Sequence, residues 1–117
     1  RPHQEWAHTE REGTDMSFAA IEMKVIQWSE ARKIYPNGKP VSQLLKGMAE
    51  LGELADAEGK QDREAIIDAV GDVMVCLTNY CLLHDLDLTA CYAHAYKQIK
   101  NRTGTLMPDG TFVRDRT

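Results

Sequence analysis

The chain has 117 residues, of which 43% are hydrophobic and 27% charged, and its formal net charge is −4. This length suits one domain with its own core and is short for two. Acidic and basic residues are interspersed, so the chain lacks the basic face of a nucleic-acid-binding protein, and no nucleic-acid partner is expected. No apolar run approaches the ~18 residues that span a membrane, and no signal-peptide pattern opens the chain. We therefore expect a cytoplasmic protein without membrane contact.

The three cysteines are odd in number and lie in apolar helical segments, at Cys76, Cys81 and Cys91. This indicates reduced core residues and argues against a disulfide framework or a zinc site. Residues 1–15 show no helical or strand periodicity, whereas a regular helical pattern begins after Met16. We expect residues 1–15 to be a disordered tail or an expression leader, and residues 16–117 to form the domain.

Apolar residues recurring at spacings of three and four predict four helices. Prolines around an Asn-Gly pair predict a loop over residues 35–40. Ser42, Asp62 and Asp87 are suitable N-caps for the later helices. The helices are expected over residues 17–34, 42–58, 62–84 and from about 87 to before 104.

Short links between four helices predict an all-α fold, an antiparallel-type four-helix bundle. Pro108-Asp109-Gly110 between short apolar pieces adds a C-terminal hairpin or ordered tail. The third helix is apolar on most of its circumference and should be the most buried. Four short helices of one chain cannot cover all the apolar surface of this helix and of the fourth helix, which is rich in Cys, Ala and Tyr. An exposed apolar face of this kind predicts a homo-oligomer, either a homodimer or a dimer of dimers.

Two acidic pairs stand at helical spacing on consecutive helices. Glu50 and Glu53 are three residues apart on the second helix, and Asp68 and Asp72 are four apart on the third. A short link makes these helices antiparallel neighbours, so the pairs can face each other. Like charges at such close range raise one another's pKa and destabilise the fold unless a cation binds. Oxygen-only ligands suit Mg²⁺, with Mn²⁺ as a substitute, and are a poor set for zinc or copper.

The alternative is that these acids form a solvated helix face. For the first pair alone this interpretation is equally good. The second pair differs, because its helix leaves little room for a solvated side. Gly52 and Gly71 each lie beside a carboxylate and each costs about 1 kcal/mol in a helix interior. Their missing side chains permit close helix approach or leave room for a metal ion and its waters, which favours the metal site.

Basic and amide side chains near these acids suggest a phosphate ligand. Lys46 lies one turn before Glu50, which either forms a helical Lys–Glu pair or places a cation for phosphate. Lys97, Lys100 and Arg102 gather at the end of the fourth helix, where they either complement the helix dipole or bind phosphate.

Two amides complete the candidate substrate contacts. Gln43 lies one turn before Lys46 on the same helix face. Asn79 lies two turns after Asp72, where it either contacts substrate or is a buried, satisfied amide.

Taken together, these residues resemble the MazG-like, all-α nucleoside triphosphate pyrophosphohydrolases, whose signature is E-x-x-E, a spacer of variable length, and E-x-x-D. The resemblance extends over about residues 25–113 and is greatest to the short, single-domain branch of phages and bacteria. It rests on Glu50-x-x-Glu53, the acidic pair ending Gly71-Asp72, Gln43-x-x-Lys46, and residues 99–102.

Two positions depart from the family pattern. Ala69 stands where the third acidic ligand usually is, and Asp68, one residue earlier, is a geometric substitute on the same helix face. Lys97 stands where Asn is common. These departures bear on the metal count and on substrate preference respectively.

The resemblance implies Mg²⁺-dependent hydrolysis of a nucleoside triphosphate to the monophosphate and pyrophosphate. Glu50, Asp68 and Asp72 are then the principal metal ligands, and Glu53 is both a ligand and the candidate base that orients water. Gln43, Lys46, Asn79, Lys97, Lys100 and Arg102 are the candidate substrate contacts. Two alternatives remain. One is a dUTP- or phosphoribosyl-ATP-hydrolysing enzyme of the same fold, and the other is a non-catalytic helical interaction module with a structural cation.

Overall fold

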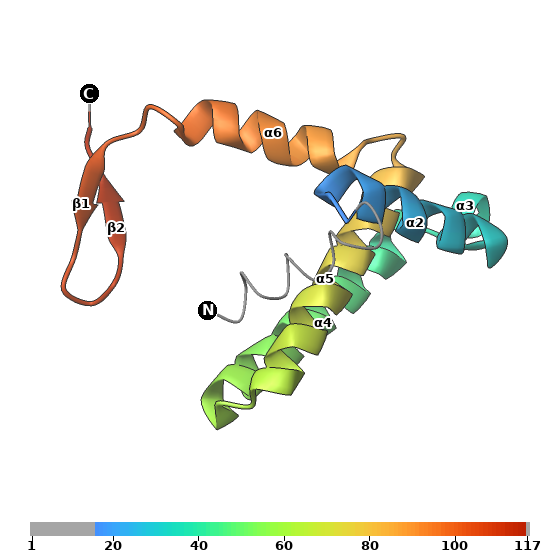
Figure 1. Cartoon of the computed structure of the whole chain (residues 1–117), viewed down its shortest axis with the longest axis horizontal. Helices are drawn as coiled ribbons and strands as arrows, with labels where there is room; N and C mark the ends of the chain where they lie inside the picture. The colour runs from blue at the N-terminus through green and yellow to red at the C-terminus, as the bar shows by residue number, and fades with distance from the viewer. Residues whose placement is uncertain (1–15, 117) are drawn as a thin grey trace.

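The computed structural model describes residues 16–116, so the segment expected to be a tail or leader, residues 1–15, lies outside it. The described chain is mostly helical, which confirms the all-α class (Figure 1). Its elements, in order, are α2 Phe18–Ala31, α3 Ile34–Asn37, α4 Pro40–Lys60, α5 Arg63–Leu83, α6 Leu88–Ile99, β1 Gly104–Leu106 and β2 Phe112–Arg114. The described residues thus form five helices where four were predicted, because the short helix α3 occupies part of the segment predicted as a loop over residues 35–40.

Two of the predicted N-caps are confirmed. Asp62 Oδ1 accepts the N–H of Ala65 at 3.2 Å before α5, and Asp87 Oδ1 accepts the N–H of Thr89 at 3.0 Å before α6. The predicted Ser42 cap is wrong, because α4 already begins at Pro40. Proline suits a first helical position, since its φ is preset and its missing N–H would have no helical acceptor there.

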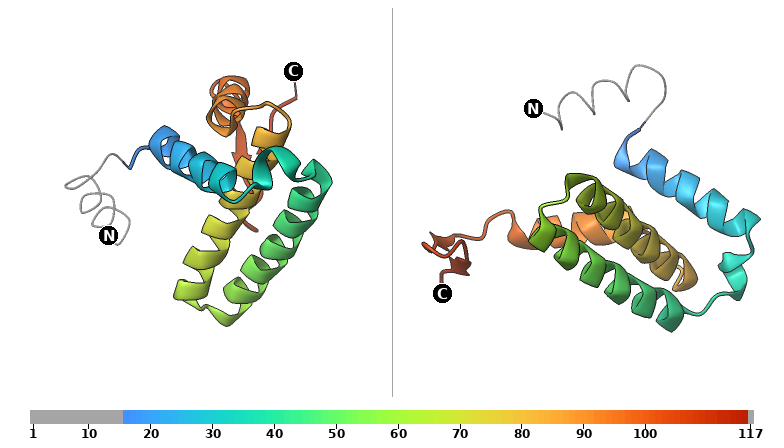
Figure 2. Two further views of the ribbon diagram at one scale, coloured as in Figure 1. Left: turned by 90° about the vertical axis from the view of Figure 1, so that its right-hand side faces the viewer. Right: turned by 90° about the horizontal axis from the view of Figure 1, so that it is seen from below.

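The long helices α4 and α5 run antiparallel and side by side, joined by Gln61 in the left-handed conformation (φ 52°) (Figures 1 and 2). Helix α5 also packs against α2, α3 and α6 and contains more buried residues than any other described helix, as predicted. By length and composition alone α5 could cross a membrane, a test that the core helix of a soluble protein passes equally. The sequence search for uninterrupted apolar runs overlooked it because Asp68 and Asp72 interrupt the run.

Helix α4 turns its polar and small side chains toward α5. Gln43, Gly47, Glu50 and Leu54 are half-buried and Ala57 is buried. The opposite face carries an apolar stripe that is 47–61% exposed in the single chain: Val41, Leu44, Leu45, Met48 and Leu51. This is the reverse of the arrangement expected for a helix that buries its apolar side against its own chain.

The hydrophobic residues that are fully buried in the described chain are all small, namely Ala57, Ala69, Cys76 and Cys81. The prediction that the cysteines are core residues is therefore confirmed for Cys76 and Cys81. It is wrong for Cys91, which is exposed on α6. Helix α6 has no fully buried residue, because it packs only on α2 and α5.

The predicted hairpin is confirmed. Strands β1 and β2 pair antiparallel, with Thr105 opposite Val113, and Gly110 takes a positive φ of 90° in the turn. The hairpin contacts no helix of the described chain, and α6 carries it away from the α4–α5 pair (Figures 1 and 2). We call residues 88–116, which comprise α6 and this hairpin, the arm.

Candidate functional site

A groove of about 270 Å³ lies between α4 and α5 at the turn-ward half of the helix pair. We call it the acidic groove because five of its side chains are carboxylates and one is a lysine. They are Glu53, Asp56, Asp62, Asp68, Asp72 and Lys60, above a floor of Ala57, Ala65 and Ala69. Lys60 pairs with Asp56 at 3.0 Å, which is the single ion pair within residues 16–116. Glu53, Asp68 and Asp72 thus remain without a cationic partner in the described chain.

Glu50 adjoins this groove and is the most perturbed acid of the site. Its pKa is raised above the ordinary value, most of all by the side chain of Glu53 beside it, then by burial and by the negative charges of Glu53 and Asp72. Lys46 acts in the opposite direction. Glu50 Oε2 is buried and has no hydrogen-bond partner. Two carboxyls that face each other in this way share a proton or attract a cation.

The pKa of the neighbouring Cys76 thiol is affected by the same charged residues. Burial raises the pKa of Cys76, Lys46 lowers it, and Glu50 and Asp72 raise it further. The acids from α4 and α5 therefore act on one point of the helix seam, as the antiparallel pairing predicts. Gly47 lies opposite Cys76, where a Cβ at position 47 would stand 3.5 Å from the Cys76 Cβ.

Among residues 16–116, no three His, Cys, Asp or Glu side chains converge closely enough to hold a metal ion as they stand. The donor set nevertheless suits Mg²⁺ or Mn²⁺, since its atoms are all carboxylate oxygens. The orphaned Glu50 Oε2 is the observation that fits a cation, because a buried acceptor without a donor costs free energy that a cation would offset.

One part of the sequence argument for this site is wrong in the single chain, and of the two uses suggested for the glycines one is contradicted. Asp68 and Asp72 are exposed, so α5 does have a solvated side at these positions. Gly52 and Gly71 do not serve close helix approach, since nothing lies within 4 Å of a Cβ built at either position. The space at both glycines is open.

An apolar cavity of about 650 Å³ lies on the other side of Asp68 and Asp72, between α2 and α5. Phe18, Ile21, Val25, Ile67, Met74 and Val75 form most of its wall. Asp68 and Asp72 line both this cavity and the acidic groove. Sequence reasoning missed the cavity, although the apolar stripe of residues 18–25 was a signal for it.

Asn79 and Gln43 lie on a buried hydrogen-bond chain that joins three helices. Ser29 Oγ on α2 donates to Asn79 Oδ1, and Asn79 Nδ2 donates to Gln43 Oε1 at 3.4 Å. Asn79 is 3% exposed, so of the two interpretations of this residue the structure has the buried, satisfied amide. Gln43 is half-buried on α4, about two turns before Glu50.

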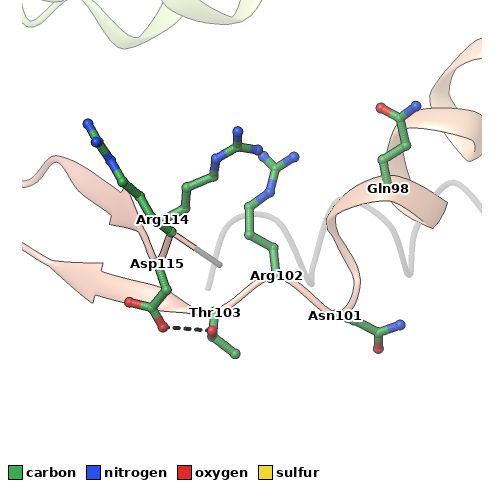
Figure 3. Close-up of a pocket in the computed structure, with 7 residues that line it drawn as sticks. Gln98, Asn101, Arg102, Thr103, Arg114 and Asp115 are labelled. Atoms are coloured by element: carbon green, nitrogen blue, oxygen red, sulfur yellow. Dashed lines mark hydrogen bonds between the residues drawn. The ribbon is translucent and has the colours of Figure 1, made fainter.

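The basic residues at the end of α6 lie apart from the acids in the single chain. Lys97 and Lys100 are exposed, and α6 does not pack on α4. Arg102 lines a separate cavity of about 650 Å³ with Arg114 and Arg116, between the end of α6 and the hairpin (Figure 3). The sequence analysis did not include these two hairpin arginines; their recurrence at positions 114 and 116 after a turn was the available signal.

Comparison with protein-family models, curated proteins and solved structures returned no match. The family resemblance therefore rests on the motif residues alone. The structure places Glu53, Asp68 and Asp72 on one groove, with Glu50 within range of the charges of Glu53, Asp72 and Lys46. Lys97, Lys100 and Arg102 lie outside this groove.

Proposed function

We propose that the chain is a Mg²⁺-dependent nucleoside triphosphate pyrophosphohydrolase that releases the nucleoside monophosphate and pyrophosphate in the cytoplasm. The observation that carries the proposal is the buried, unpartnered Glu50 Oε2 beside Glu53 and Asp72. A cluster of acids without cationic partners indicates a divalent cation, and the nearby Lys46 indicates an anionic ligand that shares it.

Glu50, Glu53, Asp68 and Asp72 would hold the cation, which when bound neutralises phosphate oxygens and makes the phosphorus more susceptible to attack. Glu53 orients the attacking water and accepts its proton. This carboxyl has the required neighbours, since it faces Glu50 on one side and the groove on the other. Lys46 stabilises the negative charge that develops on the phosphate oxygens.

Substrate recognition is divided between the two sides of Asp68 and Asp72. The apolar cavity of about 650 Å³ has room for a nucleobase next to the acidic groove that takes the phosphates. Gln43 contacts the substrate, and Asn79 positions Gln43 through their 3.4 Å hydrogen bond. Lys97, Lys100 and Arg102 reach phosphate only where α6 of another copy is close.

The functional form in this proposal is a homodimer at least, in which a second copy completes an antiparallel-type helix bundle. The support is the apolar stripe of α4, whose side chains are 47–61% exposed. Single exposed apolar residues are common on protein surfaces, whereas a continuous apolar patch of this kind usually marks an interface.

A panel of ribo- and deoxyribonucleoside triphosphates, including dUTP and phosphoribosyl-ATP, tests the proposal by pyrophosphate release with Mg²⁺ or Mn²⁺. Preferential hydrolysis of dUTP or of phosphoribosyl-ATP would assign the chain to the corresponding hydrolases of the same fold. Glu53→Gln should lower kcat by about 100-fold or more with unchanged thermal stability. Glu30→Gln, an exposed acid on α2, is the matched control and should keep full activity.

A non-catalytic helical interaction module with a structural cation is the rival function, and its support is the same groove of acids without cationic partners. It requires Mg²⁺ to raise the thermal stability while no nucleotide of the panel is consumed. That pair of results would reject the enzyme.

A further inference from the structure

The arm is basic and the α4–α5 pair is acidic. Residues 88–116 carry five Lys or Arg against two Asp, whereas residues 40–83 carry eight Asp or Glu against three Lys or Arg. Opposite net charges on two parts of a chain attract when the parts meet, yet α6 does not pack on α4 and the hairpin contacts no helix. Within one copy the arm meets this pair only where α6 packs on α5, and the hairpin with its arginines touches neither helix.

The three arginines of the arm lie close together around one cavity. Arg102, Arg114 and Arg116 line one cavity of about 650 Å³, and the side chains of Arg102 and Arg114 point to the same side of the hairpin (Figure 3). The carboxylate in that cavity, Asp115, is occupied, since its Oδ2 accepts the Thr103 hydroxyl at 2.7 Å. None of the three arginines has an ion-pair partner within the described residues.

The same arm has apolar surface that nothing covers in the single chain. Leu106 is 70% exposed, and Phe112 and Val113 are about half exposed. On α6, Tyr92 and Tyr96 are more than 60% exposed beside an apolar cavity of about 450 Å³. The apolar stripe on the outer face of α4 offers a second apolar surface, on the same helix as Glu50 and Glu53. Charge and apolar area are therefore both complementary between the arm and the α4–α5 pair.

We propose that the arm of one copy docks on the α4–α5 pair of a second copy and brings Arg114 and Arg116 to that copy's acidic groove. The two contacts are equivalent in a twofold dimer, so each groove receives its arginines from the partner. Building on the proposed function, these arginines bind the phosphate groups that the cation does not reach. The site is then composite, and a single chain is incomplete.

Association tests the docking without any assumption about activity. Sedimentation velocity should show a dimer that weakens as salt rises, and Arg114→Glu/Arg116→Glu should raise its Kd by about tenfold or more. Lys24→Glu/Lys39→Glu, which makes the same charge change outside the arm, should dimerise as the unaltered chain does. Mixing the arm variant with Asp56→Lys, which reverses a charge of the acidic groove outside the proposed cation ligands, should restore association as a heterodimer. An arm variant that dimerises normally would overturn the docking and point to pairing through the α4 stripe alone.

Complementation tests the composite site. Glu53→Gln and Arg114→Ala/Arg116→Ala should each be inactive alone, and an equal mixture should recover about a quarter of the unaltered activity, because half the dimers are mixed and each has one intact site. No recovery, or full activity of the arginine variant alone, would overturn the delivery of arginines between copies. If the unaltered chain turns over no nucleotide, the proposed function fails, while the association results still decide the docking.

Discussion

Glu22 on α2 accepts a 2.6 Å hydrogen bond from the Thr89 hydroxyl at the start of α6. The other carboxylate oxygen accepts the backbone N–H of Leu88 at 2.7 Å and that of Thr89 at 3.4 Å. A buried negative charge thus meets the positive end of the α6 dipole and satisfies donors that a helix start leaves free. This contact sets the direction in which α6 leaves the helix pair, and with it the position of the whole arm.

Glu22→Ala should lower the free energy of unfolding by about 1–3 kcal/mol, since it leaves the half-buried Leu88 N–H and Thr89 hydroxyl without an acceptor. Urea denaturation measures the change. Glu30→Ala, an exposed acid on the same helix, should change it by less than about 0.5 kcal/mol. Equal effects of the two substitutions would show that the α6 cap carries no stability.

The stability of the metal-free chain should fall as pH rises through the titration of Glu50. The folded state raises the pKa of this carboxyl above its ordinary value of 4.5, so the folded chain binds more protons than the unfolded chain over that interval. The stabilising proton is present below the ordinary value and is lost as pH rises through the raised pKa. Thermal melts in a chelator should record this decline, and Glu50→Gln should remove it.

Saturating Mg²⁺ should also remove the decline, because the cation takes the place of the proton. Glu30→Gln should leave both the pH dependence and the Mg²⁺ effect intact. A chelated chain whose Tm rises over the same pH interval would contradict this assignment of the charge cluster.

Glycine substitutions test whether a cation or a second copy occupies the open space beside the acids. Gly59 and Gly71 each have nothing within 4 Å of a built Cβ, so Gly→Ala at either should stabilise the metal-free single chain by about 1 kcal/mol through helix propensity. If a cation or a second copy occupies the space at Gly71, Gly71→Ala should weaken Mg²⁺ stabilisation or dimerisation, while Gly59→Ala does neither. Calorimetry with and without Mg²⁺ makes the comparison.

The three thiols should differ in reactivity toward iodoacetamide. Burial and the neighbouring Cys91 raise the pKa of Cys81 to about 11, so at pH 8 it is a neutral, inaccessible thiol. Cys91 is exposed on α6 and should be labelled at least about 100-fold faster than Cys81 or Cys76. Peptide mapping by mass spectrometry identifies the labelled residue. Rapid labelling of Cys81 in the folded chain would contradict the packing of α5 on α6.

Local features were predictable from the sequence. The Asp62 and Asp87 caps and the Pro-Asp-Gly hairpin depend on residues within a few positions of each other, so their signals lie in short segments. The pairing of α4 with α5 followed from the short link between them. Ser42 failed as a cap because Pro40, two residues earlier, was an equally local signal for a helix start.

The orientation of α4 was not predictable in the same way. Its apolar stripe indicates which face prefers burial but not which chain covers it, and in the single chain Gln43 and Glu50 face α5 while Leu45 faces solvent. The course of the arm had no local signal either, because it depends on Glu22 meeting Leu88 sixty-six residues later. These features are set by tertiary and subunit contacts.

Small residues form the contact between α4 and α5: Gly47 lies against Cys76, and Ala57 and Ala69 are buried there. The gap between the opposing acids is therefore governed by residues that bind nothing. A larger residue at Ala69 would act as a spacer and move Glu53 away from Asp72 without altering either. Substitutions in this contact can therefore change the cation radius that the acids accommodate, although every acidic residue is retained.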